Sequence, residues 1–347
     1  MDVTVDPGPG GDWTEPGAYE VRPDVFRLPL PLPNDGLRAV NIYAIKTPDG
    51  LILVDSGWAI RAAREALDTA LDAIGHTLTD VRRFLITHVH RDHYTQAIYV
   101  RREFGTNVSL GEGDRGSLDI VMTPARAPLK EQLQHLRLLG AGELVDKLVA
   151  ALGPDHDPVK AGWELPDVWL RGGEQIDAGA LRLEAVSTPG HTQGHMVFHD
   201  TDNALLFAGD HVLPTITPSI GFEPVLSPNP LGDFLQSLAR VRARPNARLL
   251  PAHGPVTDSV HRRVDELVAH HGKRLDQTLA AITRGAVSAY DVAGQLTWTR
   301  RERTLDELDP FNSMLAIAET AAHLELLAAQ GRVAYDDVDG LRCYRTT

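Results

Sequence analysis

The residues best suited to chemistry form one short run at 87–93, Thr-His-Val-His-Arg-Asp-His. In an extended segment, residues i and i+2 point the same way, so His88 and His90 can bind one ion together. Asp92 and His93 are adjacent, diverge in direction and can address a second ion. Imidazole and carboxylate together suit Zn²⁺, with Fe or Mn²⁺ as alternatives. A polar loop entering a helix, with Asp92 as its N-cap, is the simpler alternative, but this density of ligand types favours a metal site.

Three later segments each place a ligand-type side chain just beyond a predicted strand, next to a glycine that permits a tight turn. These side chains are His191, Asp210 and His253. Taken singly, each is also explained as an ordinary turn residue. Taken together with the 87–93 run, and in this order, the three side chains predict one cluster of five histidines and two aspartates.

The elements that must position this cluster are short β-branched runs bounded by Pro, Asp and Gly, which predict strands, and segments of helical periodicity. The predicted strands are 25–28, 41–45, 51–55, 83–87, 181–187, 195–199, 204–208 and 247–250. The predicted helices are 60–75, 231–243 and 257–283. The strand–helix–strand order indicates a layered α/β fold.

The chain divides by composition into three parts. Residues 1–20 are rich in Pro, Gly and Asp and predict a flexible N-terminal arm. Residues 21–283 carry the ligands and are interrupted by a helical insert at 125–152. Residues 284–347 form a small α+β unit, whose helix over 312–329 is apolar on one face. We therefore expect the tail to pack against the core and to form either a wall of the active site or a contact in a homodimer.

Composition limits the partners and the compartment. The chain has 47 acidic and 34 basic residues, a net charge of −13, which disfavours nucleic acid as the main partner. Cys343 is the single cysteine, so no internal disulfide can form and a cytoplasmic protein is expected. The N-terminus does not resemble a signal peptide, and no run of 18 apolar residues predicts a membrane span.

The ordered ligand set resembles the metallo-β-lactamase superfamily, whose signature H-x-H-x-D-H is followed by separate His, Asp and His ligands. The resemblance runs from about residue 22 to 272. It implies a four-layer αββα sandwich, with two mixed sheets face to face and helices outside, and a centre of two metal ions. By this resemblance the first ion is held by His88, His90 and His191, the second by Asp92, His93 and His253, and Asp210 bridges them.

Three further residues receive roles from their positions. Asp55, at the end of the 51–55 strand, matches the early aspartate of the family and would support the metal loop as a hydrogen-bond acceptor. His195 matches a position often filled by histidine in the hydrolases, and we expect it beside the ligands or facing substrate, with a hydrogen-bonded histidine at a strand end as the alternative. Tyr94 could hydrogen-bond a developing oxyanion, and a packed tyrosine at a helix start is the alternative.

Within the superfamily, Gly-Asp-His-Val-Leu-Pro at 209–214 resembles the general hydrolase branch, which includes lactamase-like ribonucleases with a winged-helix tail. Residues 284–347 are therefore expected to be winged-helix-like. Tyr-Thr-Gln at 94–96 departs from the Gly-containing run common in glyoxalase II and lactonases. Two neighbouring metals lower the pKa of a bridging water and give hydroxide near neutral pH, which Asp92 or Asp210 would orient.

The expected function is a dinuclear hydrolase of a small-molecule thioester, ester or lactone. A phosphodiesterase or ribonuclease is the first alternative, favoured by the tail and by Arg300, Arg301 and Arg303, and disfavoured by the acidic residues around them. A further alternative is a persulfide dioxygenase-like oxidoreductase, because such enzymes use the same ligand set to bind a single iron. A non-catalytic binding protein is disfavoured by the complete ligand set.

Overall fold

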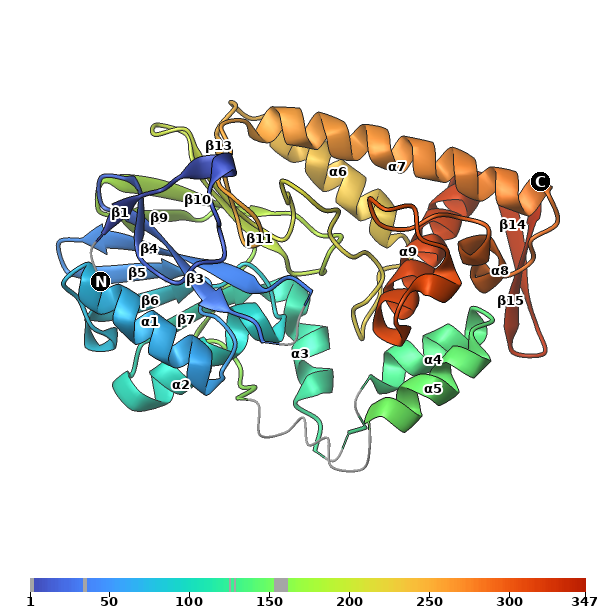
Figure 1. The fold of residues 1–347 in the computed structure, drawn as a ribbon, viewed down its shortest axis with the longest axis horizontal. Coiled ribbons are helices and arrows are strands. Elements are labelled where there is room, and N and C mark those ends of the chain that lie inside the picture. The colour runs from blue at the N-terminus through green and yellow to red at the C-terminus, as the bar shows by residue number, and fades with distance from the viewer. Residues whose placement is uncertain (1–2, 34–35, 125, 128, 153–161) are drawn as a thin grey trace. The chain divides into compact units, whose positions relative to one another are not determined.

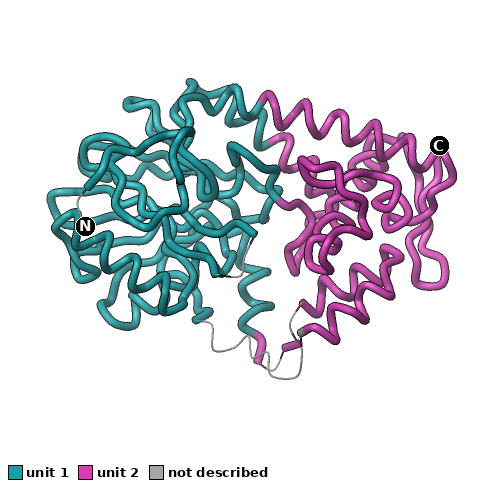
Figure 2. Tube along the Cα trace, in the orientation of Figure 1, with its two compact units in different colours: residues 1–122, 159–218, 237–264 teal, residues 123–158, 219–236, 265–347 magenta. Residues whose placement is uncertain are grey.

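The structure is a computed structural model of the 347-residue chain. It describes residues 3–33, 36–124, 126–127, 129–152 and 162–347. The chain divides into two compact units (Figure 2). Unit 1 comprises residues 1–122, 159–218 and 237–264, and unit 2 comprises residues 123–158, 219–236 and 265–347.

Unit 1 contains a mixed sheet of eight strands in sequential order (Figure 1). The strands are β1 Thr4–Val5, β2 Tyr19–Arg22, β3 Val25–Pro31, β4 Ala39–Thr47, β5 Gly50–Val54, β6 Val81–Leu85, β7 Asn107–Gly111 and β8 Val168–Leu170. Strands β2 to β5 pair antiparallel, and β5 to β8 pair parallel. The parallel pairs require crossover connections, and helix α1 Arg61–Ala73 lies between β5 and β6, whereas helix α2 Arg91–Phe104 lies between β6 and β7.

A second mixed sheet in unit 1 has the strand order β13-β12-β11-β10-β9. Its strands are β9 Gln175–Ala178, β10 Leu181–Ser187, β11 Met196–Asp200, β12 Leu205–Gly209 and β13 Arg248–Pro251. One core cluster joins inward side chains of both sheets, such as Tyr43 and Phe207, and another lies between the first sheet and helices α1 and α2. The expected fold of two mixed sheets flanked by helices is therefore confirmed.

Unit 2 contains four complete α-helices among the described residues and a β-hairpin. It includes helices α4 Lys130–Leu138, α5 Gly142–Leu152, α8 Ala289–Gly294 and α9 Pro310–Ala329, and strands β14 Val333–Val338 and β15 Leu341–Thr346. Helices α6 Pro230–Arg242 and α7 Val260–Thr283 contribute residues to both units, and α3 Arg115–Val121 belongs to unit 1. Helices α4 and α5 lie within the predicted insert, of which residues 125 and 128 are outside the described residues. The predicted domain boundaries and the winged-helix assignment stay predictions.

The described N-terminal residues make two contacts with the first sheet that composition alone does not predict. Strand β1 pairs parallel with β2, and Asp6 accepts a hydrogen bond from the buried Arg27 side chain at 2.6 Å. A buried, charge-assisted hydrogen bond between residues 21 positions apart ties this segment to the sheet. Residues 1 and 2 lie outside the described residues.

Across the described ranges, we find no helix that is both long enough and apolar enough to cross a lipid bilayer.

Candidate metal centre

The 87–93 run follows β6 as a short, bent segment and then enters α2. His90 is the N-cap of α2, with φ −63° and ψ 150°, so His88 and His90 precede the helix. Asp92 and His93 lie in its first turn. This change from extended to helical backbone separates the two pairs of side chains in direction.

The structure brings all seven predicted ligands together in two groups. Within each group, one possible ligand atom from every residue lies within 4.8 Å of the others. One group contains His88, His90, His191 and Asp210, and the other contains Asp92, His93 and His253. All are buried except His90 and Asp92, which are half-buried.

The carboxylate of Asp210 faces both groups. Its Oδ2 lies 3.5 Å from Nε2 of His191, whereas its Oδ1 lies 3.4 Å from Nε2 of His253 and 3.7 Å from Nε2 of His93. Tetrahedral ligands at Zn²⁺ bonding distance are roughly 3.3 Å apart, so these separations match ligands that share an ion. One oxygen of Asp210 is thus directed to each group.

Unpartnered polar atoms at the centre also fit a cation. Nε2 of His88, His93 and His253 and Oδ1 of Asp210 are buried and have no hydrogen-bond partner. Buried polar atoms are almost always satisfied, so four such atoms in one cluster need an explanation. Imidazole nitrogens and a carboxylate oxygen are all ligand atoms for zinc-type ions, and the donor set therefore fits a centre of two metals.

Burial and charge divide the histidines into two kinds. Burial and neighbouring imidazoles lower the pKa of His88 and His90, to about 3 for His90, so both are neutral and can offer a lone pair. Burial acts in the same direction on His93, but Asp92 and two further carboxylates outweigh it and raise the pKa of His93 to about 10. The ligands of an ion must be deprotonated, so binding at the second group releases a proton.

Residues behind the ligands fix their orientation. Oδ1 of Asp55 accepts a hydrogen bond from the Thr87 backbone N–H at 2.7 Å, and its Oδ2 lies 2.8 Å from Nδ1 of His93. His253 donates through Nδ1 to the backbone oxygen of Ala39 at 2.8 Å. Such contacts select the tautomer that presents Nε2 to an ion.

His195 and Tyr94 both lie in buried positions. Nε2 of His195 accepts a hydrogen bond from the backbone N–H of Asp210 at 3.1 Å, and its Nδ1 lies 2.9 Å from the hydroxyl oxygen of Thr188. His195 therefore positions the backbone of Asp210. The hydroxyl of Tyr94 donates to the backbone oxygen of Glu164 at 2.6 Å. This geometry favours the packing role of Tyr94 over the oxyanion role.

Asp114, which the sequence analysis missed, joins the two ligand-bearing loops. Its Oδ2 accepts from the Val89 N–H at 2.8 Å, and its Oδ1 accepts from the Gly194 N–H at 2.7 Å. A Cβ on Gly111 would overlap the backbone oxygen of Gly194, and a Cβ on Gly194 would overlap Asp114 itself. The backbones meet this closely only because both positions are glycine. No local pattern around Asp114 indicates these contacts.

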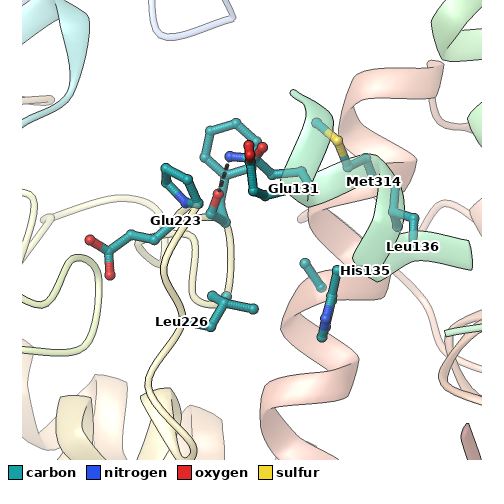
Figure 3. Close-up of a pocket in the computed structure, with 11 residues that line it drawn as sticks. Glu131, His135, Leu136, Glu223, Leu226 and Met314 are labelled. Carbon is teal, nitrogen blue, oxygen red and sulfur yellow. Dashed lines mark hydrogen bonds between the residues drawn. The ribbon is translucent and has the colours of Figure 1, made fainter. Parts of the chain in front are cut away.

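A separate cavity of about 140 Å³ lies in unit 2 (Figure 3). Its apolar lining includes Leu136, Leu226 and Met314, and its polar lining includes His135. Nε2 of Gln132 donates to the backbone oxygen of Phe222 at 2.9 Å, whereas Oε1 of Gln132 is buried without a hydrogen-bond partner. The lining also includes Glu131 and Glu223, so the cavity has both apolar and acidic walls.

Comparison with known proteins identifies the class that this fold and site define. Residues 35–253 match the Metallo-beta-lactamase superfamily, and the chain therefore belongs to it. Together with the His/Asp clusters, this makes the protein a metal-dependent hydrolase of that superfamily.

Individual relatives extend the similarity along the chain. The chain is 23% identical over 326 residues to the probable metallo-hydrolase YqjP of Bacillus subtilis (strain 168), covering 88% of this chain and 93% of the relative. It is 28% identical over 174 residues to a hydroxyacylglutathione hydrolase of Aeromonas salmonicida (strain A449), covering 49% and 45%. The crystal structure of the metallo-beta-lactamase family protein TTHA1429 from Thermus thermophilus superimposes with a TM-score of 0.74 at 29% identity, covering 94% and 100%.

Proposed function

We propose that the protein is a dinuclear zinc hydrolase of small-molecule acyl substrates, namely thioesters, esters or lactones. The observation that carries the dinuclear assignment is the carboxylate of Asp210, whose two oxygens face different ligand groups at 3.4 to 3.7 Å. Five imidazoles with two carboxylates favour zinc over hard cations such as Mg²⁺, which prefer oxygen ligands.

Two bound zinc ions would supply Lewis acidity and an activated water at neutral pH. The protein contributes orientation. Asp55 and Ala39 hold His93 and His253 by their Nδ1 atoms, so that Nε2 of each ring points to the centre. His195 holds the backbone of Asp210. Half-buried Asp92 has a carboxylate at the centre that can accept a hydrogen bond from the attacking water. The reaction therefore needs no nucleophilic serine or cysteine.

Electrostatics support an acyl substrate over a polyanion. A nucleic-acid enzyme neutralises several phosphates with Lys and Arg, and its affinity depends on that neutralisation. This chain has 13 more acidic than basic residues, and its centre carries the carboxylates of Asp55, Asp92 and Asp210. The relative from Aeromonas salmonicida is named for hydrolysis of an acylglutathione, which is an acyl substrate. A small-molecule partner is therefore favoured over nucleic acid.

A parallel assay tests the proposal. Zinc-loaded enzyme is given aryl esters, acyl thioesters, lactones, bis-nitrophenyl phosphate and single-stranded RNA. We expect turnover of at least one acyl class, loss of that turnover in His88→Ala, and wild-type turnover in His76→Ala, which replaces a histidine outside the centre. RNA or diester turnover far above every acyl substrate, and lost in His88→Ala, would reject the acyl assignment in favour of a phosphodiesterase. Purified protein with a single iron and its electronic spectrum would instead support the oxidoreductase alternative.

A further inference from the structure

Unit 2 contains a second cluster of metal-binding residue types, apart from the seven residues described above. His270 and His271 on α7 and Glu319 on α9 each offer a ligand atom within 4.8 Å of the others. His271 is fully buried, Glu319 is half-buried and His270 is exposed. The cluster therefore has a buried floor and one side open to solvent, which provides an entry path for an ion.

A chain of hydrogen bonds sets the tautomer of His271. Nδ1 of His323 lies 2.7 Å from the backbone oxygen of Glu319, which can only accept, so Nδ1 carries the proton. In the neutral ring, Nε2 of His323 is then an acceptor, and it lies 3.2 Å from Nδ1 of His271. His271 consequently donates through Nδ1, and its Nε2 keeps a lone pair. Metal-ligating histidines are typically oriented in this way, with the second ring nitrogen donating to an acceptor.

We propose that His270, His271 and Glu319 bind one divalent transition-metal ion of the zinc class. Two imidazoles and one carboxylate are a donor set that such ions use, with a remaining position for water. The ligands come from two helices of one compact unit, so the bound ion would join α7 to α9. This ion is additional to those of the hydrolase centre, and it requires nothing of the proposed substrate.

The positive charge of Arg274 lowers the affinity of this cluster for a metal ion, but its guanidinium does not occupy the site. The positive charge of Arg274 acts on Glu319 and opposes a second cation. The guanidinium of Arg274 is directed elsewhere, because it lies 4.1 Å from the centre of the Trp298 ring and donates to the backbone oxygen of Thr297 at 3.1 Å. We therefore expect this site to fill at higher free zinc than the hydrolase centre.

The test is the zinc content of the full chain in equilibrium dialysis against increasing free Zn²⁺. The variants are His270→Ala, which changes an exposed side chain, and Glu319→Gln, which removes the charge at nearly constant shape. The matched control is His261→Ala, because His261 is also on α7 but bonds to the backbone oxygen of Arg244. Circular dichroism verifies that each variant is folded.

Wild type and His261→Ala should bind one more zinc ion per chain than His270→Ala and Glu319→Gln, and hydrolysis by His270→Ala should equal that of wild type. His323→Phe, which removes the acceptor of His271, should weaken the extra ion by about 10- to 100-fold. Equal zinc content in wild type and both ligand variants at every free Zn²⁺ concentration would overturn the proposal. Because the readout is a difference of one ion between variants, this outcome leaves the hydrolase centre unaffected.

Discussion

Asp114→Asn offers a test of how the two ligand-bearing loops are held together. Each oxygen of the Asp114 carboxylate accepts one backbone N–H, from Val89 at 2.8 Å and from Gly194 at 2.7 Å. An asparagine side chain has one acceptor oxygen and one NH₂ group. The substitution therefore leaves one of the two N–H groups facing another donor.

Two opposing free energies determine the effect on stability. A buried N–H without an acceptor costs about 1–3 kcal/mol. Burial raises the pKa of Asp114 from 3.8 to about 6, although hydrogen bonds from Gly194 and Val89 oppose the rise. A shift of about two units means that ionised Asp114 costs the folded state about 3 kcal/mol at pH 8, and asparagine removes this cost. The free energy of unfolding at pH 8 should therefore change by no more than about 2 kcal/mol, because the two effects largely cancel.

Metal affinity should respond differently, because it depends on the geometry of the loops. Loss of a contact that orients ligands typically lowers metal affinity about 10- to 100-fold. The assay is urea unfolding of the metal-free chain at pH 8, together with zinc competition against a chelator. Asp119→Asn, on an exposed residue of the neighbouring helix α3, is the matched control. Wild-type zinc affinity in Asp114→Asn, or destabilisation above about 4 kcal/mol with unchanged affinity, would refute the reasoning.

Three other perturbations give separate tests. Asp210→Ala should lower the metal content below two ions per chain by elemental analysis, because Asp210 faces both groups, and a full complement of two would contradict bridging. Burial raises the pKa of Glu325 from 4.5 to about 7, so stability that is present below pH 4.5 is lost as the pH rises through 7. Glu325→Gln should therefore stabilise the chain by about 1–3 kcal/mol at pH 8 and not at pH 4, and equal melting-temperature shifts at both would be inconsistent with this cause. Met314→Ala should lower the free energy of unfolding in urea by about 2–5 kcal/mol, because Met314 is 1% exposed and lies beside an existing cavity. A decrease below about 1 kcal/mol would contradict this, since it would mean that neighbouring side chains fill the space that Met314 leaves.

The four ligands at 88–93 were predictable from the sequence because their geometry is local, and His191, Asp210 and His253 were predictable because their order along the chain resembles that of the superfamily. The alternation of an extended segment and the turn into a helix decide how residues 87–93 point, and glycine-flanked turns follow the later strands. Asp114 was not predictable, since its partners Val89 and Gly194 are 25 and 80 residues away. The contacts of the N-terminal segment were not predictable for the same reason: composition describes its own propensity, whereas the buried bond between Asp6 and Arg27 depends on the folded sheet.

The close approach of Gly111 to Gly194 has a consequence for directed evolution of this enzyme. The loop that carries His191 and His195 is the natural target for changing substrate preference, yet any side chain at position 194 would overlap Asp114. A library randomised over 192–194 should therefore return glycine alone at 194 among active clones, whatever substrate is selected. Changes in specificity would therefore have to arise at positions outside this contact. Positions 111 and 194 stay glycine under any selection for activity, whereas variation is confined to other positions around the active site.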